Sequence, residues 1–217
     1  MTSRSFIVAI DGPAASGKGT LARRLAERFG LAHLDTGTLY RATALLVLED
    51  NADPADPVAA TAAARRVDQS LLSDPLLRDE RVAHAASVVA ANPEVRQALL
   101  DFQRNFAAHP PVPARGAVLD GRDIGSVVCP AADVKLFVTA DPEVRALRRL
   151  AELQARGVAA IYSDVLQELE YRDTRDAGRG TAPMVVPPDA VVINTTALDA
   201  DAVLERASDI VSRAIAG

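Results

Sequence analysis

The fold of this chain is decided by Gly12-Pro13-Ala14-Ala15-Ser16-Gly17-Lys18-Gly19-Thr20, which closely follows the apolar run Phe6-Ile7-Val8-Ala9-Ile10. A strand, a glycine-flanked loop and a helix in this order gather backbone N–H groups that suit a polyphosphate. The glycines let the backbone turn sharply, and Lys18 adds a cation. The spacing fits the G-x-x-x-x-G-K phosphate-loop pattern. We predict that residues 12–20 bind the phosphates of a nucleoside triphosphate; the alternative is a glycine-rich turn without a ligand.

Composition limits the remaining choices. The 217 residues suit one domain with insertions or two small domains. A net charge of −5 argues against a general nucleic-acid binder, and no apolar run approaches the ~18 residues that span a membrane. The chain starts Met-Thr-Ser-Arg and then enters a strand, so we expect no signal peptide and a cytoplasmic location. Cys129 is the single cysteine, which excludes an internal disulfide and a cysteine-rich metal site.

Five short apolar runs predict strands, at 5–10, 31–35, 117–120, 134–138 and 190–194. Several lack polar alternation, which is typical of strands buried on both faces of a parallel sheet. Helical periodicity follows at about 142–156, 163–173 and 200–215, with Asp141-Pro142 and Asp199 as expected starts. The fold class is therefore α/β, with a five-stranded parallel sheet covered by helices.

Two segments extend beyond this sheet. Residues 38–108 form a long helical stretch that residues 51–57 break once and a proline-rich segment closes. Ligands of open α/β sheets bind at the carboxyl ends of the strands, so an insertion there can close over a substrate. Residues 172–188, rich in charge, glycine and proline, are a second candidate flap.

Two charged segments, Asp35–Arg41 and Asp120–Gly125, follow predicted strands, and a third, Arg172–Arg179, forms the candidate flap. Carboxylates beside a phosphate loop can position Mg²⁺ or its waters, and arginines can neutralise a transferring phosphoryl group. Each segment alone could be a helix cap, a surface ion pair or solvated charge. Together they favour an acceptor anion, whereas a nucleotide-dependent switch, the alternative from another class, needs none. A GTPase is disfavoured because no Asn-Lys-x-Asp motif follows a strand.

These segments resemble those of the bacterial cytidylate kinases, in the same order along the chain. The resembling segments are Ile10–Thr20, Leu34–Arg41, Ala85–Ala90, Pro93–Leu100, Asp120–Val128 and the arginine- and aspartate-rich flap. Asp120-Gly121-Arg122-Asp123 is the discriminating element, because adenylate kinases carry Asp-Gly-Phe-Pro-Arg there. The resemblance implies a three-layer P-loop kinase fold with core segments 1–37 and 115–217. It also implies a monophosphate-binding insertion at 38–114 and a lid at about 172–188.

The resemblance also implies roles for single residues. The nine residues 12–20 would hold the ATP phosphates. Ser87, Arg96 and Asp123 would face the cytosine ring, and Arg41 and Arg122 would grip the monophosphate.

Further contacts implied by the resemblance lie near the monophosphate and in the lid. Thr36 would lie near the monophosphate, and Asp120 would be a further substrate-binding residue. Arg172 and Asp176 would contact the sugar, and Arg179 would reach a phosphate.

The implied activity is transfer of the γ-phosphoryl group of ATP to CMP, and to dCMP, in pyrimidine nucleotide metabolism. Lys18, Arg122, Arg175 and Arg179 would be catalytic, Mg²⁺ would accompany ATP without an assigned protein ligand, and the enzyme would be a monomer. Independently of the resemblance, a carboxylate such as Asp123 complements the N4 amino group of cytosine and opposes O4 of uracil. A kinase for UMP, AMP or another polar acceptor is the nearest alternative.

Overall fold

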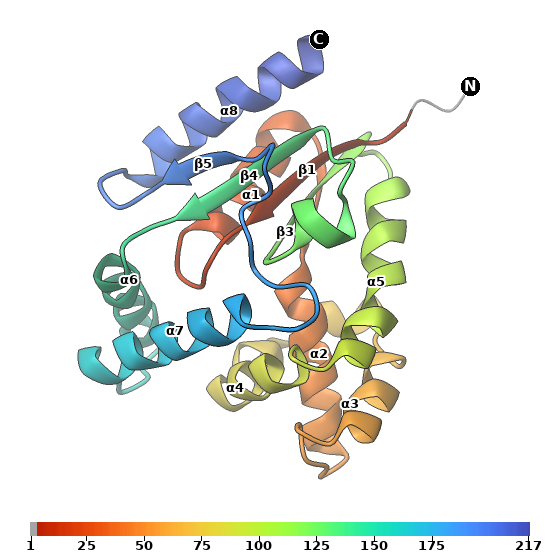
Figure 1. Cartoon of the computed structure of the whole chain (residues 1–217), viewed down its shortest axis with the longest axis vertical. Helices are drawn as coiled ribbons and strands as arrows, with labels where there is room; N and C mark the ends of the chain where they lie inside the picture. Colours follow the sequence, from red (N-terminus) through yellow and green to blue (C-terminus); the bar gives the residue numbers. More distant parts are fainter. Residues whose placement is uncertain (1–3) are drawn as a thin grey trace. The chain divides into compact units, whose positions relative to one another are not determined.

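The computed structural model describes residues 4–217. Residues 1–3, on which the expectation about a signal peptide partly depends, lie outside the described residues. The five strands form one sheet in the order β2-β3-β1-β4-β5, and Figure 1 labels β3, β1, β4 and β5 of this sheet. Its strands are β1 (Phe6–Asp11), β2 (Ala32–Asp35), β3 (Gly116–Gly121), β4 (Val134–Thr139) and β5 (Val191–Asn194). The predicted five-stranded α/β sheet is thus confirmed.

Two helices pack against the sheet through apolar side chains that recur at helical spacing. Helix α1 (Lys18–Phe29) buries Leu21 and Leu25, and α8 (Ala200–Ala216) buries Leu204 and Val211. These side chains join the inward residues of β1, β3, β4 and β5 in one hydrophobic core. The side chain of Asp199 caps α8 by accepting the N–H groups of Asp201 and Ala202, as the sequence predicts.

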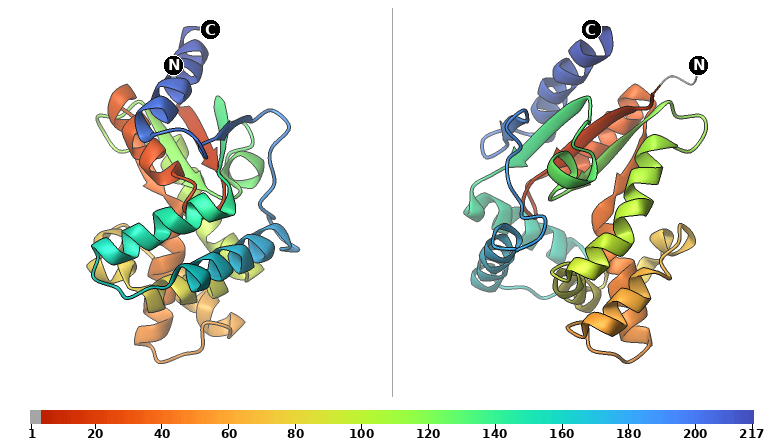
Figure 2. Two further views of the ribbon diagram at one scale, coloured as in Figure 1. Left: turned by 90° about the vertical axis from the view of Figure 1, so that its left-hand side faces the viewer. Right: turned by 45° about the vertical axis from the view of Figure 1, so that its right-hand side comes forward.

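A second, smaller hydrophobic cluster joins α6 (Pro142–Ala155) and α7 (Tyr162–Ala177), which run side by side in both views of Figure 2. Helix α6 has Pro142 in its first turn after Asp141, as predicted. Helix α7 is longer than the predicted 163–173 and includes the first residues of the predicted lid. The arginines of the lid therefore start on a helix rather than in an irregular loop.

The contacts between Cα atoms divide the chain into two compact units. Unit 1 contains the described residues up to His33 and Ala107–Gly217, and unit 2 contains Leu34–Phe106. The domain limits predicted from the sequence, at 37/38 and 114/115, stay a prediction.

The chain from Thr36 to Ala108, most of it in unit 2, is helical as expected. Its elements are α2 (Thr36–Glu49), α3 (Pro57–Ala64), the 3₁₀ turns η1 (Ser70–Ser73) and η2 (Pro75–Arg78), α4 (Glu80–Val89) and α5 (Pro93–Ala108). The break between α2 and α3 agrees with the prediction. Two further breaks were missed: residues 65–79, which contain the two 3₁₀ turns, and residues 90–92 between α4 and α5.

Strand β5 differs from the expectation that the strands are buried on both faces. It lies at the edge of the sheet, and Val191 and Val192 are 39% and 45% exposed. An apolar run does not reveal whether its strand will be central or at an edge. Among residues 4–217, no helix combines the length and the apolar character that crossing a membrane requires.

Candidate functional site

The loop between β1 and α1 has the backbone of an anion site. Gly12, Ala15 and Gly17 have φ angles of +148°, +57° and +90°. A Cβ atom placed at Gly12 would lie 2.0 Å from the carbonyl oxygen of Val138, so only glycine fits there. Alternation of left- and right-handed residues turns successive N–H groups toward one side of a loop, where they can bind a phosphate.

Helix α1 adds its positive end to this loop. Gly17 occupies the N-cap position, and no side chain caps the first N–H groups of the helix. The Nζ atom of Lys18 lies 3.2 Å from the carbonyl oxygen of Pro13, so the lysine folds back over the loop. The loop, the helix end and the lysine charge together favour a polyphosphate.

Asp120, near the end of β3, lies beside the start of α1. Its side chain is buried, and its Oδ2 atom would be 3.6 Å from a Cβ atom placed at Gly19. The Nε2 atom of His33 lies 2.8 Å from its Oδ1 atom, which orients the carboxylate. A Cβ atom at Gly19 would thus make ordinary van der Waals contact with this carboxylate, so Asp120 lies directly beside the end of the loop.

Asp11, the last residue of β1, is a buried carboxylate. Its two oxygens accept the backbone N–H groups of Ile124 and Gly125, at 2.7 and 2.8 Å. Burial raises the pKa of Asp11 to about 6, although these two hydrogen bonds and the charge of Arg122 oppose the rise. Asp11 thus connects the strand before the phosphate loop with the segment that carries Arg122 and Asp123.

Asp176, near the end of α7, lies between two arginines. Its Oδ2 atom accepts a hydrogen bond from Nε of Arg122 at 2.9 Å, and its Oδ1 atom pairs with Arg179. Burial alone would raise the pKa of Asp176, but Arg122 and Arg179 together hold it below the ordinary value. The lid, residues 172–188, is thereby connected with the Asp120–Asp123 segment.

Arg145, on α6, connects the phosphate loop with α7. It is 3% exposed and donates to the carbonyl oxygens of Ala140 and Ala14, at 3.0 and 3.3 Å. Its guanidinium also pairs with Asp173 at 2.6 Å. Two arginines of α7 lie close to Asp173 in sequence. Arg172 is partly buried, and the guanidinium of Arg175 lies 5.1 Å from the ring centre of Tyr171.

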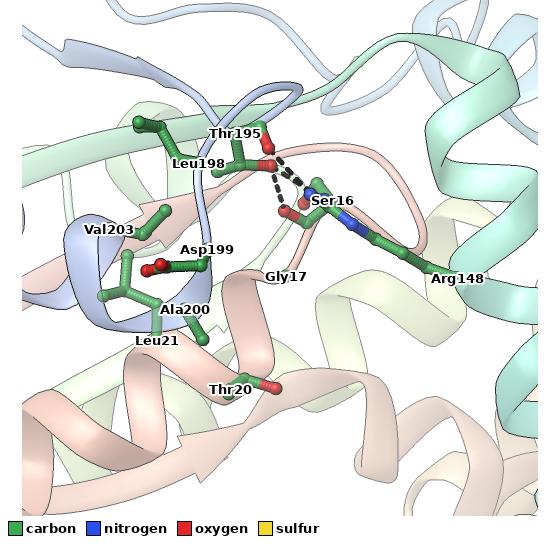
Figure 3. Close-up of a pocket in the computed structure, with 10 residues that line it drawn as sticks. All are labelled: Ser16, Gly17, Thr20, Leu21, Arg148, Thr195, Leu198, Asp199, Ala200 and Val203. Atoms are coloured by element: carbon green, nitrogen blue, oxygen red, sulfur yellow. Dashed lines mark hydrogen bonds between the residues drawn. The ribbon is translucent and has the colours of Figure 1, made fainter.

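Unit 1 contains a cavity of about 280 Å³ beside the phosphate loop. Figure 3 shows its lining residues, which come from the loop, α1, α6, the turn between β5 and α8, and the start of α8. Thr195 donates to the carbonyl oxygen of Ser16 at 3.0 Å. It also receives two hydrogen bonds from Arg148, to its hydroxyl at 2.9 Å and to its carbonyl oxygen at 2.7 Å.

Unit 2 carries the other predicted substrate residues. Thr36 is the first residue of α2 and is buried, and Arg41, one turn further, donates to the carbonyl oxygen of Leu77 at 2.9 Å. Ser87 on α4 and Arg96 on α5 are each 8% exposed. A buried arginine is costly unless its charge has partners.

Arg96 has such partners within unit 2. Its guanidinium lies 5.4 Å from the ring centre of Tyr40 and donates to the carbonyl oxygen of Ala90 at 3.3 Å. The aromatic ring and the carbonyl therefore hold a positive charge in a largely buried position next to the C-terminal end of α4.

The structure thus brings together, within unit 1, the phosphate loop, Asp120, Arg122, Asp123 and the charged end of α7. Sequence reasoning missed several residues that hold this arrangement or line the cavity: Asp11, His33, Arg145, Arg148, Asp173 and Thr195. Their partners lie far away in sequence, so no local spacing reveals them. One signal was available, because Asp11 is a charged residue at the end of an otherwise apolar strand.

Comparison with known proteins agrees with this geometry. A sequence model of the family described as Cytidylate kinase matches residues 8–213. The cytidylate kinase of Rhodospirillum rubrum is 58% identical over 207 residues, covering 95% of this chain and 97% of that protein. The cytidylate kinase of Methylocella silvestris is 55% identical over 209 residues, covering 96% and 95%.

Solved structures share the fold at lower identity. An uncharacterized protein from Eubacterium ventriosum is 15% identical with a TM-score of 0.54, over 96% of this chain and 99% of that one. A Thermus thermophilus protein is 22% identical with a TM-score of 0.51, over 99% of this chain and 100% of that one.

Proposed function

Because the chain belongs to the cytidylate kinase family, we infer that it is a nucleoside monophosphate kinase that phosphorylates CMP with ATP as the donor. Activity on dCMP and a place in pyrimidine nucleotide metabolism follow from the family. One structural observation supports this most. Strands β1 and β3 are neighbours with Asp11 opposite Gly121, so the phosphate loop and the Arg122-Asp123 pair leave the same edge of the sheet.

The donor site follows from the loop and the cavity. We assign the ATP phosphates to residues 12–20 and the nucleoside of ATP to the cavity beside them. The guanidinium of Arg148, which Thr195 holds through two hydrogen bonds, offers a flat cation to the donor base. A phosphate chain on the loop and a base in the adjoining cavity would be bound by one continuous surface of unit 1.

The acceptor residues are proposed from their chemistry and the family. Arg41, Arg122 and Arg179 supply positive charge for phosphates, and Thr36 a hydroxyl. Asp123, Ser87 and Arg96 offer an acceptor and donors that match the N4, N3 and O2 atoms of cytosine. Arg172 and Asp176 are assigned to the sugar, and Asp120 to the neighbourhood of the transferring group. We propose that the helical insertion, 38–114, is the monophosphate-binding domain.

The reaction needs no nucleophile from the protein. An oxygen of the CMP phosphate forms a bond to the γ-phosphorus of ATP. The bond from that phosphorus to the β,γ-bridging oxygen breaks, and ADP leaves with the electron pair. The protein contributes orientation and charge neutralisation. Lys18, Arg122, Arg175 and Arg179 are the cations that we assign to the developing charge.

Mg²⁺ is proposed as the ion that accompanies ATP. Among residues 4–217 no group of three His, Cys, Asp or Glu side chains could hold a metal ion. The buried Asp120 carboxylate beside Gly19 nevertheless suits an ion that takes most ligands from the nucleotide and water. Asp120 and the hydroxyl of Thr20 would orient those waters, and the bound ion would supply charge neutralisation on the ATP phosphates.

The product identifies the reaction most simply. The protein should convert ATP and CMP into ADP and CDP in equal amounts, which ³¹P NMR of the mixture can follow. ATP hydrolysis that proceeds without consumption of CMP would instead indicate a nucleotide-dependent switch. We also propose a cytoplasmic monomer, which the family supports.

A further inference from the structure

The carboxylate of Asp11 is arranged as a two-point clamp. The side chain is 1% exposed, and each of its oxygens accepts one backbone N–H group, from Ile124 and from Gly125. Both partners of these hydrogen bonds are held by regular structure. Asp11 is paired with Gly121 in the sheet, and Ile124 begins a π-helical turn.

That turn, η3 (Ile124–Val128), needs a cap at its start. Asp123 occupies the N-cap position and its residue type often caps its own helix, yet its side chain makes no capping hydrogen bond. Its backbone carbonyl instead accepts the N–H groups of Val127 and Val128, at 2.9 and 3.1 Å. Asp11, more than 100 residues earlier in the chain, satisfies the first N–H groups in its place.

Capping of this turn by Asp11 affects the proposed acceptor site. Capping from Asp11 fixes the backbone on the C-terminal side of Asp123, while β3 fixes the backbone on the N-terminal side. The capping role is therefore separated from the side chain that we assign to the cytosine ring. Because Gly12 follows Asp11 directly, the same residue also ties this backbone to the phosphate loop.

We propose that Asp11 is a positioning residue for CMP recognition, which acts by holding the backbone of Asp123 in the orientation that discriminates cytosine from uracil. The inference rests on the proposed function, in which Asp123 contacts the base. Both oxygens of Asp11 accept N–H groups, so an amide cannot replace the carboxylate without turning an N–H donor toward another donor.

The test compares three variants of the full-length protein by the ratio of kcat/KM for CMP to kcat/KM for UMP. Asp11→Asn should lower this ratio about tenfold, because a displaced Asp123 carboxylate would lose the hydrogen bond that distinguishes N4 of cytosine from O4 of uracil. The KM for ATP should change less than the KM for CMP. The ratio is measured on the folded fraction alone, so reduced stability does not alter it.

Asp133→Asn is the matched control. Asp133 also accepts a backbone N–H group of β1, from Ile7 at 2.8 Å, but at the opposite end of the strand from the phosphate loop. It should lower stability and leave the ratio unchanged. If Asp11→Asn yields no folded protein, Asp11→Ser, which retains one acceptor oxygen, replaces it with the same expected direction.

Asp123→Asn separates the two proposals. An unchanged ratio in Asp123→Asn would reject contact between Asp123 and the base, and the role of Asp11 with it. A lowered ratio in Asp123→Asn with an unchanged ratio in Asp11→Asn would reject the role of Asp11 alone. An equal fall in Asp11→Asn and Asp133→Asn would also reject it, because a general weakening of β1 would then explain both.

Discussion

At the scale of single residues, the site is a set of charges held by long-range partners. Lys18 folds over its loop toward Pro13, Asp120 is oriented by His33, and Arg122 is held by Asp176. None of these partners is close in sequence except Pro13. The residues that we propose to contact the nucleotides could be expected from motifs, whereas the residues that orient their side chains required the structure.

Lys18→Ala should lower kcat by about 10²-fold or more, because the lysine is assigned to the charge that develops on the β- and γ-phosphates. The fold should be retained, since the side chain lies on the loop and not in the core. Steady-state kinetics and circular dichroism check this. Arg23→Ala, which removes an exposed cation from the same helix, is the control and should keep the parent rate. Turnover within threefold of the parent in Lys18→Ala would refute the role of the loop.

Asp11 should make the stability of the protein depend on pH. Burial raises its pKa from 3.8 to about 6, so the folded protein holds a proton that the unfolded chain has released. The contribution of Asp11 to the free energy of unfolding is therefore complete below pH 3.8 and is lost as the pH rises through about 6.

The shift corresponds to roughly 3 kcal/mol at 1.36 kcal/mol for each pKa unit. Urea unfolding of the parent and Asp11→Asn at several pH values measures it, because the other titrating groups cancel in the difference. The free energy of the parent relative to the variant should fall between pH 4 and pH 7. A constant difference would show that the pKa of Asp11 is not raised.

At the scale of elements, the segment that begins on α7 is the one that we propose to move, as a lid over the nucleotides. From the sequence alone, one expects mutual repulsion among Arg172, Arg175 and Arg179. The structure places Asp176 against Arg179 and Arg122, which offsets that repulsion. We propose that Arg122 and Arg179 exchange the Asp176 carboxylate for substrate phosphates when the nucleotides bind.

Closure of the lid should require both nucleotides, since only their combined phosphates supply the negative charge that these arginines neutralise. Hydrogen exchange across residues 172–188 should therefore slow most with a bisubstrate analogue, less with either nucleotide alone. Arg179→Ala should lower kcat by about 10²-fold. Equal exchange with and without ligand, together with full activity of Arg179→Ala, would remove the lid from the mechanism.

The turn between β5 and α8 should govern binding of the donor. Thr195→Val removes the hydrogen bond to Ser16 and one of the two bonds from Arg148, so the KM for ATP should rise about tenfold with the KM for CMP unchanged. Thr195→Ser retains the hydroxyl and should restore the parent value. Equal effects on both substrates would indicate general loss of structure.

Much of this architecture could be predicted, because its signals are local. The five strands, the break near residues 51–57, and the starts of α6 and α8 follow from apolar runs, prolines and capping residues. The exposed faces of Val191 and Val192, the two 3₁₀ turns and the Arg148–Thr195 cavity could not, since each depends on which distant segments become neighbours. The predicted roles of single site residues stay predictions.

At the scale of the whole molecule, one chain of 22.9 kDa carries a phosphate-loop unit and a helical unit. We expect a monomer, as the resemblance to the cytidylate kinases implies. Sedimentation equilibrium should give the mass of one chain with and without nucleotides. A dimer whose activity falls on dilution would contradict this expectation.

We propose that Asp123 and its neighbours make this P-loop kinase select cytosine. The most direct measurement is kcat/KM for CMP, dCMP, UMP and AMP at saturating ATP, followed through coupled release of ADP. CMP should exceed UMP by roughly ten- to a hundredfold, since O4 of uracil would leave a buried carboxylate opposite a lone pair. A preference for UMP or AMP, or ADP release that does not depend on the acceptor, would contradict the selection of cytosine.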